Sequence, residues 1–145
     1  MTPSHPELRA YPVIVSLPVQ WGEMDAYGHV NNTVFFRYFE TARIAFLDQC
    51  GFLACYERDK IGAILLTTDC RFRRPLVYPD TVLVGGCAKQ VAEDRFTMGY
   101  RLVSLAQDAI AAEGSGVIVS YDYKTGAKTT LPDGVRARIA EMHDA

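Results

Sequence analysis

One long segment of the chain combines helical spacing with many aromatic residues, and it restricts the possible folds more than any other feature. Its apolar face, which has the spacing of an amphipathic helix, carries Phe35, Tyr38, Phe39, Ala42, Ala45, Phe46 and Leu47. Asn31 or Asn32 suits the N-cap and Gly51 suits the C-terminal stop, so a helix of about five turns is predicted. Because the stripe is broad and aromatic, we expect a curved sheet to lie around this helix.

Alternation of apolar and polar residues predicts strands in most of the remaining chain. The predicted strands span residues 13–21, 61–74, 81–91, 96–102 and 109–123. Pro18 has no amide hydrogen for a strand ladder, which favours an edge position for the first strand. Gly114 and Gly116 indicate a bulge or a close approach by another backbone in the last strand.

Turn-forming residues set the expected order of these elements. Glu93–Asp94 and Gln107–Asp108 are predicted hairpin turns, and a short amphipathic helix is predicted after Asp133. The expected order is therefore one strand, the long helix, and then four strands in succession by hairpins. This is an α+β arrangement with one helix packed on a largely antiparallel sheet.

Length and charge exclude several classes of function. The 145 residues fit a single domain, residues 1–145, in which residues 1–12 are expected to form a flexible N-terminal segment. A formal net charge of -2 gives no global attraction to phosphates, so neither nucleic acid nor a membrane surface is an expected partner. No apolar run approaches the roughly 20 residues that span a bilayer. Residues 1–11 also lack the apolar segment of a secretory signal, so we expect a soluble, cytoplasmic protein.

The cysteines are interpreted as reduced thiols, because a chain this large and apolar does not need disulfides to fold. Cys50 and Cys55 form the nearest pair, and no second pair follows at a spacing that would complete a zinc site. Neither a metal nor another cofactor is therefore expected.

A polar loop over residues 22–32 separates the first strand from the long helix and carries the residues best suited to chemistry. Asp25 can simply order this loop, or it can act as an ionised carboxylate favoured by the nearby helix N-terminus. A free amide at that terminus can stabilise an oxyanion, and with a carboxylate nearby acyl transfer or hydrolysis becomes feasible. No serine or cysteine with a base partner lies in this stretch, so a Ser-His-Asp mechanism is not supported.

The other polar residues of this region each have a structural and a functional interpretation. Gly28 suits a left-handed turn or a close backbone approach. His29 can be a general base, a substrate contact or a structural residue. Asn31 and Asn32 can contact a substrate or cap the helix. Glu40 is expected to pair with an arginine three residues away, with general-base work as the alternative.

Arg71, Arg73 and Arg74 form the densest basic cluster of the chain, at the end of a predicted strand. Their guanidinium groups have the geometry to hold phosphates. The alternative is an ordinary solvated strand face.

The loop and the helix together resemble a known signature. Asp25–Asn32, followed by Phe35, Tyr38–Glu40 and Ala42–Arg43, is similar to the motif of the hotdog-fold acyl-CoA thioesterases, specifically the 4-hydroxybenzoyl-CoA thioesterase type. Phe72–Leu76 with Pro79–Asp80 resembles a later strand of that family. The resemblance implies the hotdog fold, a curved antiparallel sheet of about five strands wrapped round one long helix. It also implies homodimers that pair their sheets edge to edge, can assemble into homotetramers, and have active sites at the dimer interface.

The resemblance also implies roles for particular residues. The aspartate matching Asp25 is the catalytic carboxylate, acting as a nucleophile through a mixed anhydride or as a general base for water. The backbone amide matching Asn32 polarises the thioester carbonyl. The resemblance further implies that basic residues near the surface, often from a neighbouring subunit, hold the phosphates of coenzyme A. We expect Gly28, His29, Asn31, Arg73 and Arg74 to bind the substrate.

The function predicted from this resemblance is hydrolysis of an acyl-CoA thioester to a free carboxylic acid and coenzyme A. The Asn31–Asn32 form is similar to members that act on fatty acyl-CoA. Two alternatives remain at this point. One is a hotdog dehydratase acting on a 3-hydroxyacyl thioester with His29 as base, and the other is a non-catalytic module that binds acyl thioesters.

Overall fold

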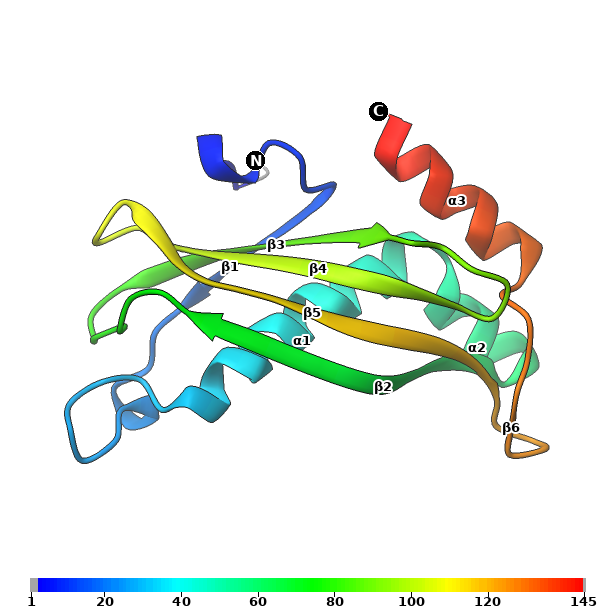
Figure 1. Ribbon diagram of the computed structural model, residues 1–145, viewed down its shortest axis with the longest axis horizontal. Helices are drawn as coiled ribbons and strands as arrows, with labels where there is room; N and C mark the ends of the chain where they lie inside the picture. The colour runs from blue at the N-terminus through cyan, green and yellow to red at the C-terminus, as the bar shows by residue number, and fades with distance from the viewer. Residues whose placement is uncertain (1–2, 145) are drawn as a thin grey trace.

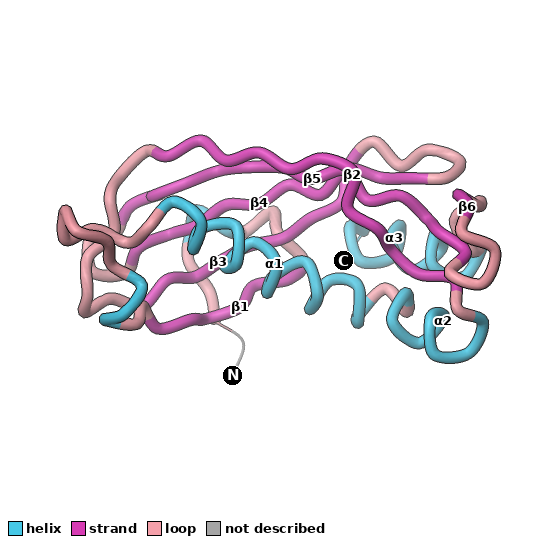
Figure 2. The backbone as a smooth tube through the Cα atoms, turned by 90° about the horizontal axis from the view of Figure 1, so that it is seen from below, coloured by secondary structure: helices cyan, strands magenta, loops and turns pink. Residues whose placement is uncertain are grey.

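The chain folds into an antiparallel sheet that curves around one long helix, as Figures 1 and 2 show for the computed structural model, which describes residues 3–144. The helices are α1 (Asn32–Gln49), α2 (Phe52–Asp59) and α3 (Asp133–Asp144), with short 3-10 turns at Pro6–Leu8 and Trp21–Glu23. The strands are β1 (Val13–Pro18), β2 (Ile61–Phe72), β3 (Thr81–Lys89), β4 (Arg95–Ser104), β5 (Ala109–Asp122) and β6 (Ala127–Lys128). The predicted α+β architecture is confirmed.

The strands are ordered β1-β3-β4-β5-β2 in the sheet, with the short β6 paired to β5. The predicted edge position of the strand that contains Pro18 is confirmed, since within residues 3–144 β1 pairs with β3 alone. The predicted hairpins β3–β4 and β4–β5 are also present. The predicted hairpin between β2 and β3 is wrong, because β2 pairs with β5 at the opposite edge of the sheet. Pairing between strands distant in sequence replaces the local hairpin there.

The core lies between α1 and the concave face of the sheet. The buried face of α1 is the predicted stripe, and the side chains in it are Phe35, Tyr38, Phe39, Ala42, Phe46 and Leu47. Phe39 stacks on Tyr100 of β4, with ring centroids 4.8 Å apart and an interplanar angle of 12°. A Cβ atom at Gly114 of β5 would collide with the Phe39 ring and with the carbonyl oxygen of Asp69. The close backbone approach predicted at this glycine is therefore confirmed.

The structure differs from the sequence-based boundaries at several points. The first strand ends at Pro18 rather than residue 21, because the chain turns into a 3-10 helix at Trp21–Glu23, where Trp21 is 72% exposed. Gly51 ends α1 with a φ of 84°, as predicted, but a second helix, α2, starts directly after it. That helix is too short to show a periodic stripe of its own. The strand predicted over residues 61–74 ends at Phe72.

The N-terminal segment lies on the outer face of the sheet at one end of the molecule, whereas α3 lies at the other end (Figure 1), where its buried Val135, Ile139 and Met142 join the main core. Residues 3–12, for which the sequence predicts flexibility, lie against this face through the fully buried Leu8, which packs on Leu83 and Val103. His5 contacts Asp108 in the β4–β5 turn at 2.8 Å.

The four cysteines are free thiols; Cys50 and Cys55 are buried, while Cys70 and Cys87 are half-buried. Burial raises the pKa of Cys50 and of Cys70 to about 11. No helix within residues 3–144 is long and apolar enough to cross a membrane.

Candidate active site

A pocket of about 340 Å³ opens between the loop that precedes α1, the first turn of α1 and the segment that follows β2. The pocket is lined by Asp25, His29, Val30, Asn32, Phe35, Phe72, Arg73, Arg74 and Pro75. Asp25, His29, Asn32, Arg73 and Arg74 were all singled out from the sequence, and the fold brings them to one place. Gly28 and Asn31, predicted as substrate-binding residues, are not among the lining residues.

The start of α1 leaves the backbone amide of Asn32 free at this pocket. Asn31 is the N-cap, and its side-chain oxygen accepts hydrogen bonds from the amide of Thr33 at 3.0 Å and from its hydroxyl at 2.9 Å. The amide of Val34 donates to the Asn31 carbonyl at 3.0 Å. Within residues 3–144 the Asn32 amide donates to no group, so it is available to a ligand.

The loop itself is closed by local hydrogen bonds. An Asp25 carboxylate oxygen accepts from the amide of Tyr27 at 2.8 Å, an Asx turn, and the Asp25 amide donates to the His29 carbonyl at 2.8 Å. Gly28 has a φ of 78°, which confirms the predicted left-handed turn. The other carboxylate oxygen of Asp25 makes no hydrogen bond within residues 3–144, and the side chain is exposed at the pocket.

The inner wall of the pocket is aromatic. Phe35 of α1 and Phe72 of β2 meet edge to face, with ring centroids 5.0 Å apart. Phe72 is 48% exposed although it lies beside the core. The sequence pattern predicts only a structural role for the rings of Phe35 and Phe72. Their role in the pocket depends on the β2 end reaching the α1 start, which no local signal indicates.

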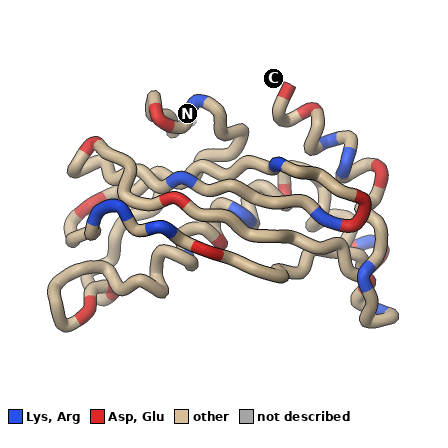
Figure 3. The backbone as a smooth tube through the Cα atoms, in the orientation of Figure 1, with Lys and Arg blue, Asp and Glu red and all other residues tan. Residues whose placement is uncertain are grey.

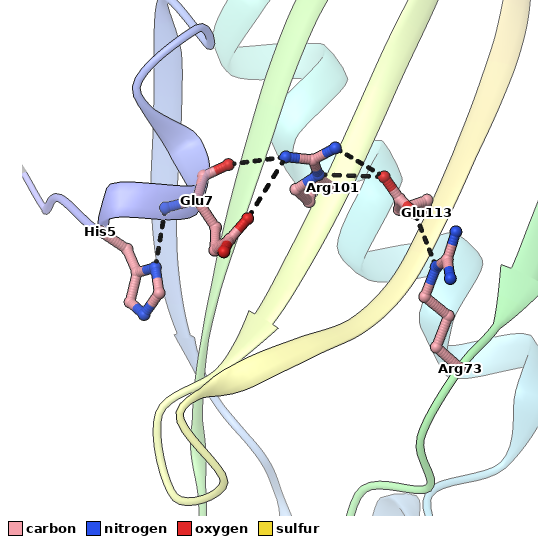
Figure 4. A network of polar contacts seen from close by, with 5 residues as sticks. All are labelled: His5, Glu7, Arg73, Arg101 and Glu113. Carbon is pink, nitrogen blue, oxygen red and sulfur yellow. Dashed lines mark hydrogen bonds and ion pairs between the residues drawn. The ribbon is translucent and has the colours of Figure 1, made fainter.

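Arg73 lines the pocket and also belongs to a network of ion pairs, which Figure 4 shows. Its Nε donates to Glu113 Oε1 at 2.6 Å, and the other oxygen of Glu113 accepts from Arg101 Nη2 at 2.8 Å. Burial opposes ionisation of Glu113, but the guanidinium groups of Arg101 and Arg73 outweigh it and hold the pKa of the carboxyl below its usual value. Arg101 also donates to the Glu7 carbonyl at 3.0 Å, which joins the N-terminal segment to the network.

Arg73 and Arg74 also line a larger pocket of about 930 Å³ beside the N-terminal segment. Basic residues at the end of β2 and acidic residues in the loop before α1 lie at the same end of the molecule (Figure 3). Arg71, the third member of the predicted basic cluster, lines neither pocket. Glu113 and Arg101, which the sequence analysis does not identify, face one another across β4 and β5. The register of the β4–β5 hairpin, whose turn was predicted from the sequence, would have placed Arg101 opposite Glu113.

Glu40 makes the predicted ion pair with Arg43 at 3.5 Å and lies outside the pocket that contains Asp25. Within the described part of the chain, no group of three or more His, Cys, Asp and Glu side chains could hold a metal ion. A carboxylate and a free helix-terminal amide thus share a pocket with two guanidinium groups. The carboxylate can activate a water molecule or act as the nucleophile itself, and the amide can stabilise an oxyanion. The guanidinium groups can hold an anionic ligand.

Comparison with known proteins points to one family. The family model described as the thioesterase-like superfamily matches residues 19–139. The PA2801 protein of Pseudomonas aeruginosa is 32% identical and superimposes with a TM-score of 0.79, over 89% of this chain and 98% of that chain. A thioesterase from Thermus thermophilus, complexed with coenzyme A and Zn, is 27% identical with a TM-score of 0.83, over 94% and 98% of the two chains.

Slr0204 of Synechocystis, a 1,4-dihydroxy-2-naphthoyl-CoA thioesterase, has the same fold. The TM-score is 0.78 over 89% of this chain and 96% of that chain, at 18% identity.

Proposed function

The chain belongs to the thioesterase-like superfamily and has the hotdog fold, and we propose that it hydrolyses an acyl-CoA thioester to a carboxylic acid and coenzyme A. The observation that carries this proposal is the shared pocket, in which the Asp25 carboxylate and the free Asn32 amide lie beside an aromatic wall. A thioester carbonyl needs a nucleophile on its carbon and a donor on its oxygen.

Two routes fit this pair of groups. In the first, Asp25 takes a proton from water, the hydroxide attacks the carbonyl carbon, and the Asn32 amide donates to the resulting oxyanion. The C–S bond then breaks, and the thiolate of coenzyme A leaves and takes up a proton. In the second, an Asp25 oxygen attacks the carbonyl carbon and expels the thiolate, and water hydrolyses the mixed anhydride.

We assign substrate binding to His29, Arg73 and Arg74, which line the pocket. The guanidinium groups suit the phosphates of coenzyme A. Gly28 and Asn31, in contrast, serve the site by shaping the turn and capping α1. Within the superfamily, the Asp25–Asn32 motif supports a relation to the 4-hydroxybenzoyl-CoA thioesterase type.

The outer edge of β2, which pairs with no other strand of residues 3–144, supports a homodimer as the active form. Ile64, Leu65 and Leu66 are 39%, 39% and 53% exposed along this edge strand. A long apolar edge invites pairing with another strand. Antiparallel pairing of two β2 edges around a two-fold axis would bring the Phe72 end of each β2 strand close to the partner subunit. Residues of that partner would then complete the open pocket. We propose this homodimer, which can assemble into a homotetramer, as a cytoplasmic enzyme.

Thiol release from a panel of thioesters tests the function. Straight-chain acyl-CoA substrates of increasing length, an aromatic acyl-CoA and an acyl carrier protein thioester would be compared by the rate at which free thiol appears. We expect thiol release from coenzyme A thioesters, and the thioester hydrolysed fastest would identify the preferred acyl group. Dehydration of a 3-hydroxyacyl thioester releases no thiol. Stabilisation of the protein by a thioester without any thiol release would refute hydrolysis and support a binding module.

A further inference from the structure

Glu23 lies at the root of the loop that carries Asp25 and contacts two other elements. One carboxylate oxygen, Oε1, accepts from the backbone amide of Gln20 at 2.7 Å and from the hydroxyl of Tyr38 at 2.8 Å. The carbonyl of Glu23 accepts from the amide of Asn31, the N-cap of α1, at 2.9 Å. Glu23 therefore joins the entrance of the loop to both the cap and the second turn of the helix.

Tyr38 is a rigid anchor for this carboxylate. Its side chain is 4% exposed and belongs to the core beneath the sheet. Burial and the neighbouring Glu23 carboxylate raise the pKa of Tyr38, so the hydroxyl stays protonated and remains a donor. A hydrogen bond to an ionised acceptor is stronger than one between neutral groups, and partial burial strengthens it further.

The remaining contacts of the loop transmit this anchoring to Asp25. Met24, next to Glu23, forms an isolated antiparallel bridge with Val30. The Val30 amide donates to the Leu76 carbonyl at 2.8 Å. Asp25 follows Met24 directly and is the first residue of the exposed part of the loop. The contact between Glu23 and Tyr38 therefore fixes the position of Asp25 relative to the start of α1.

We propose that Glu23 and Tyr38 are positioning residues, which hold the Asp25 carboxylate at a fixed place relative to the free amide of Asn32. This role rests on the proposed thioester hydrolysis. Neither residue lines the pocket, so they act through the loop and not on the substrate. A reacting carboxylate displaced by even about 1 Å loses much of its rate advantage, whereas substrate affinity, set by other groups, changes little.

Four variants test the proposal in the full-length protein. Tyr38→Phe removes only the donor, Glu23→Ala removes the acceptor, and Glu23→Gln keeps an oxygen for both donors. Tyr100→Phe is the matched control, since Tyr100 is 1% exposed and its hydroxyl accepts from Arg43 at 3.3 Å, away from the loop. Steady-state kcat and KM would be measured by thiol release, and hydrogen exchange would be followed at the loop amides.

We expect Tyr38→Phe and Glu23→Ala to lower kcat at least about fivefold with KM within about twofold of wild type. Exchange at the Asp25 and Asn31 amides should accelerate in both. Glu23→Gln should restore most of the kcat, and Tyr100→Phe should change neither kcat nor loop exchange, whatever it does to Tm.

A Tyr38→Phe enzyme whose kcat and loop exchange match those of Tyr100→Phe would overturn the positioning role. Wild-type protein that releases no thiol from any thioester would instead refute the proposed function. In that case the exchange measurement still decides whether Glu23 and Tyr38 hold the loop.

Discussion

Replacing Asp25 by Asn separates the chemistry of this residue from its part in the fold. The carboxylate oxygen that accepts from the Tyr27 amide at 2.8 Å has a counterpart in the asparagine side chain. The Asx turn can therefore persist, and the exposed position has no ion pair to lose within residues 3–144. What Asp25→Asn removes is the negative charge needed by a nucleophile or a general base.

The structure sets the expected magnitudes. Asp25→Asn should leave the free energy of unfolding nearly unchanged and lower kcat at least about a hundredfold, which raises the barrier by about 2.7 kcal/mol. Asp25→Ala should lose the same activity and, in addition, the hydrogen bond to the Tyr27 amide. That bond contributes about 1 kcal/mol, so Tm should fall by about 4 °C.

The assay is thiol release at saturating acyl-CoA, with thermal unfolding of each variant measured in parallel. Both variants should be inactive, and only Asp25→Ala should be destabilised. Near-normal turnover by a folded Asp25→Asn protein would refute the reasoning, because no other carboxylate of residues 3–144 lines the pocket. Inactivity accompanied by unfolding would show that the turn depends on the charge and not only on the oxygen.

Other parts of the molecule yield further predictions. Because ion pairing depresses the pKa of Glu113, its stabilising effect should be present above pH 4.5 and lost as pH falls below it; the Tm difference between wild type and Glu113→Gln should shrink in that range. Gly114→Ala should destabilise by about 1–3 kcal/mol in urea unfolding, whereas Gly134→Ala, with nothing within 4 Å, should not. Leu66→Lys on the β2 edge should yield an inactive monomer by light scattering, whereas Leu105→Lys, at a similarly exposed leucine, should keep the wild-type oligomer.

Much of the fold can be read from the sequence because it depends on local patterns. The stripe of Phe35, Phe39 and Phe46 lies on one face of any helix built from these residues, so both the helix and its buried side follow from spacing alone. The same holds for the β3–β4 and β4–β5 hairpins, whose strands are joined by short turns. Asp25 and Asn32 are close in sequence, and the turn at Gly28 keeps them close in space.

The remaining parts of the site depend on pairings between distant segments. Local periodicity predicts that β2 is a strand, but it does not predict that β2 pairs with β5 rather than with β3. The pairing of β2 with β5 closes a long loop, and the local sequence of the two strands carries no signal for such a distant pairing. That pairing alone carries Phe72 and Arg73 to the start of α1 and sets Glu113 beside Arg73. The sequence by itself therefore determined the helix, its cap and the carboxylate-bearing loop. Only the tertiary structure decided which aromatic wall and which guanidinium groups surround that carboxylate.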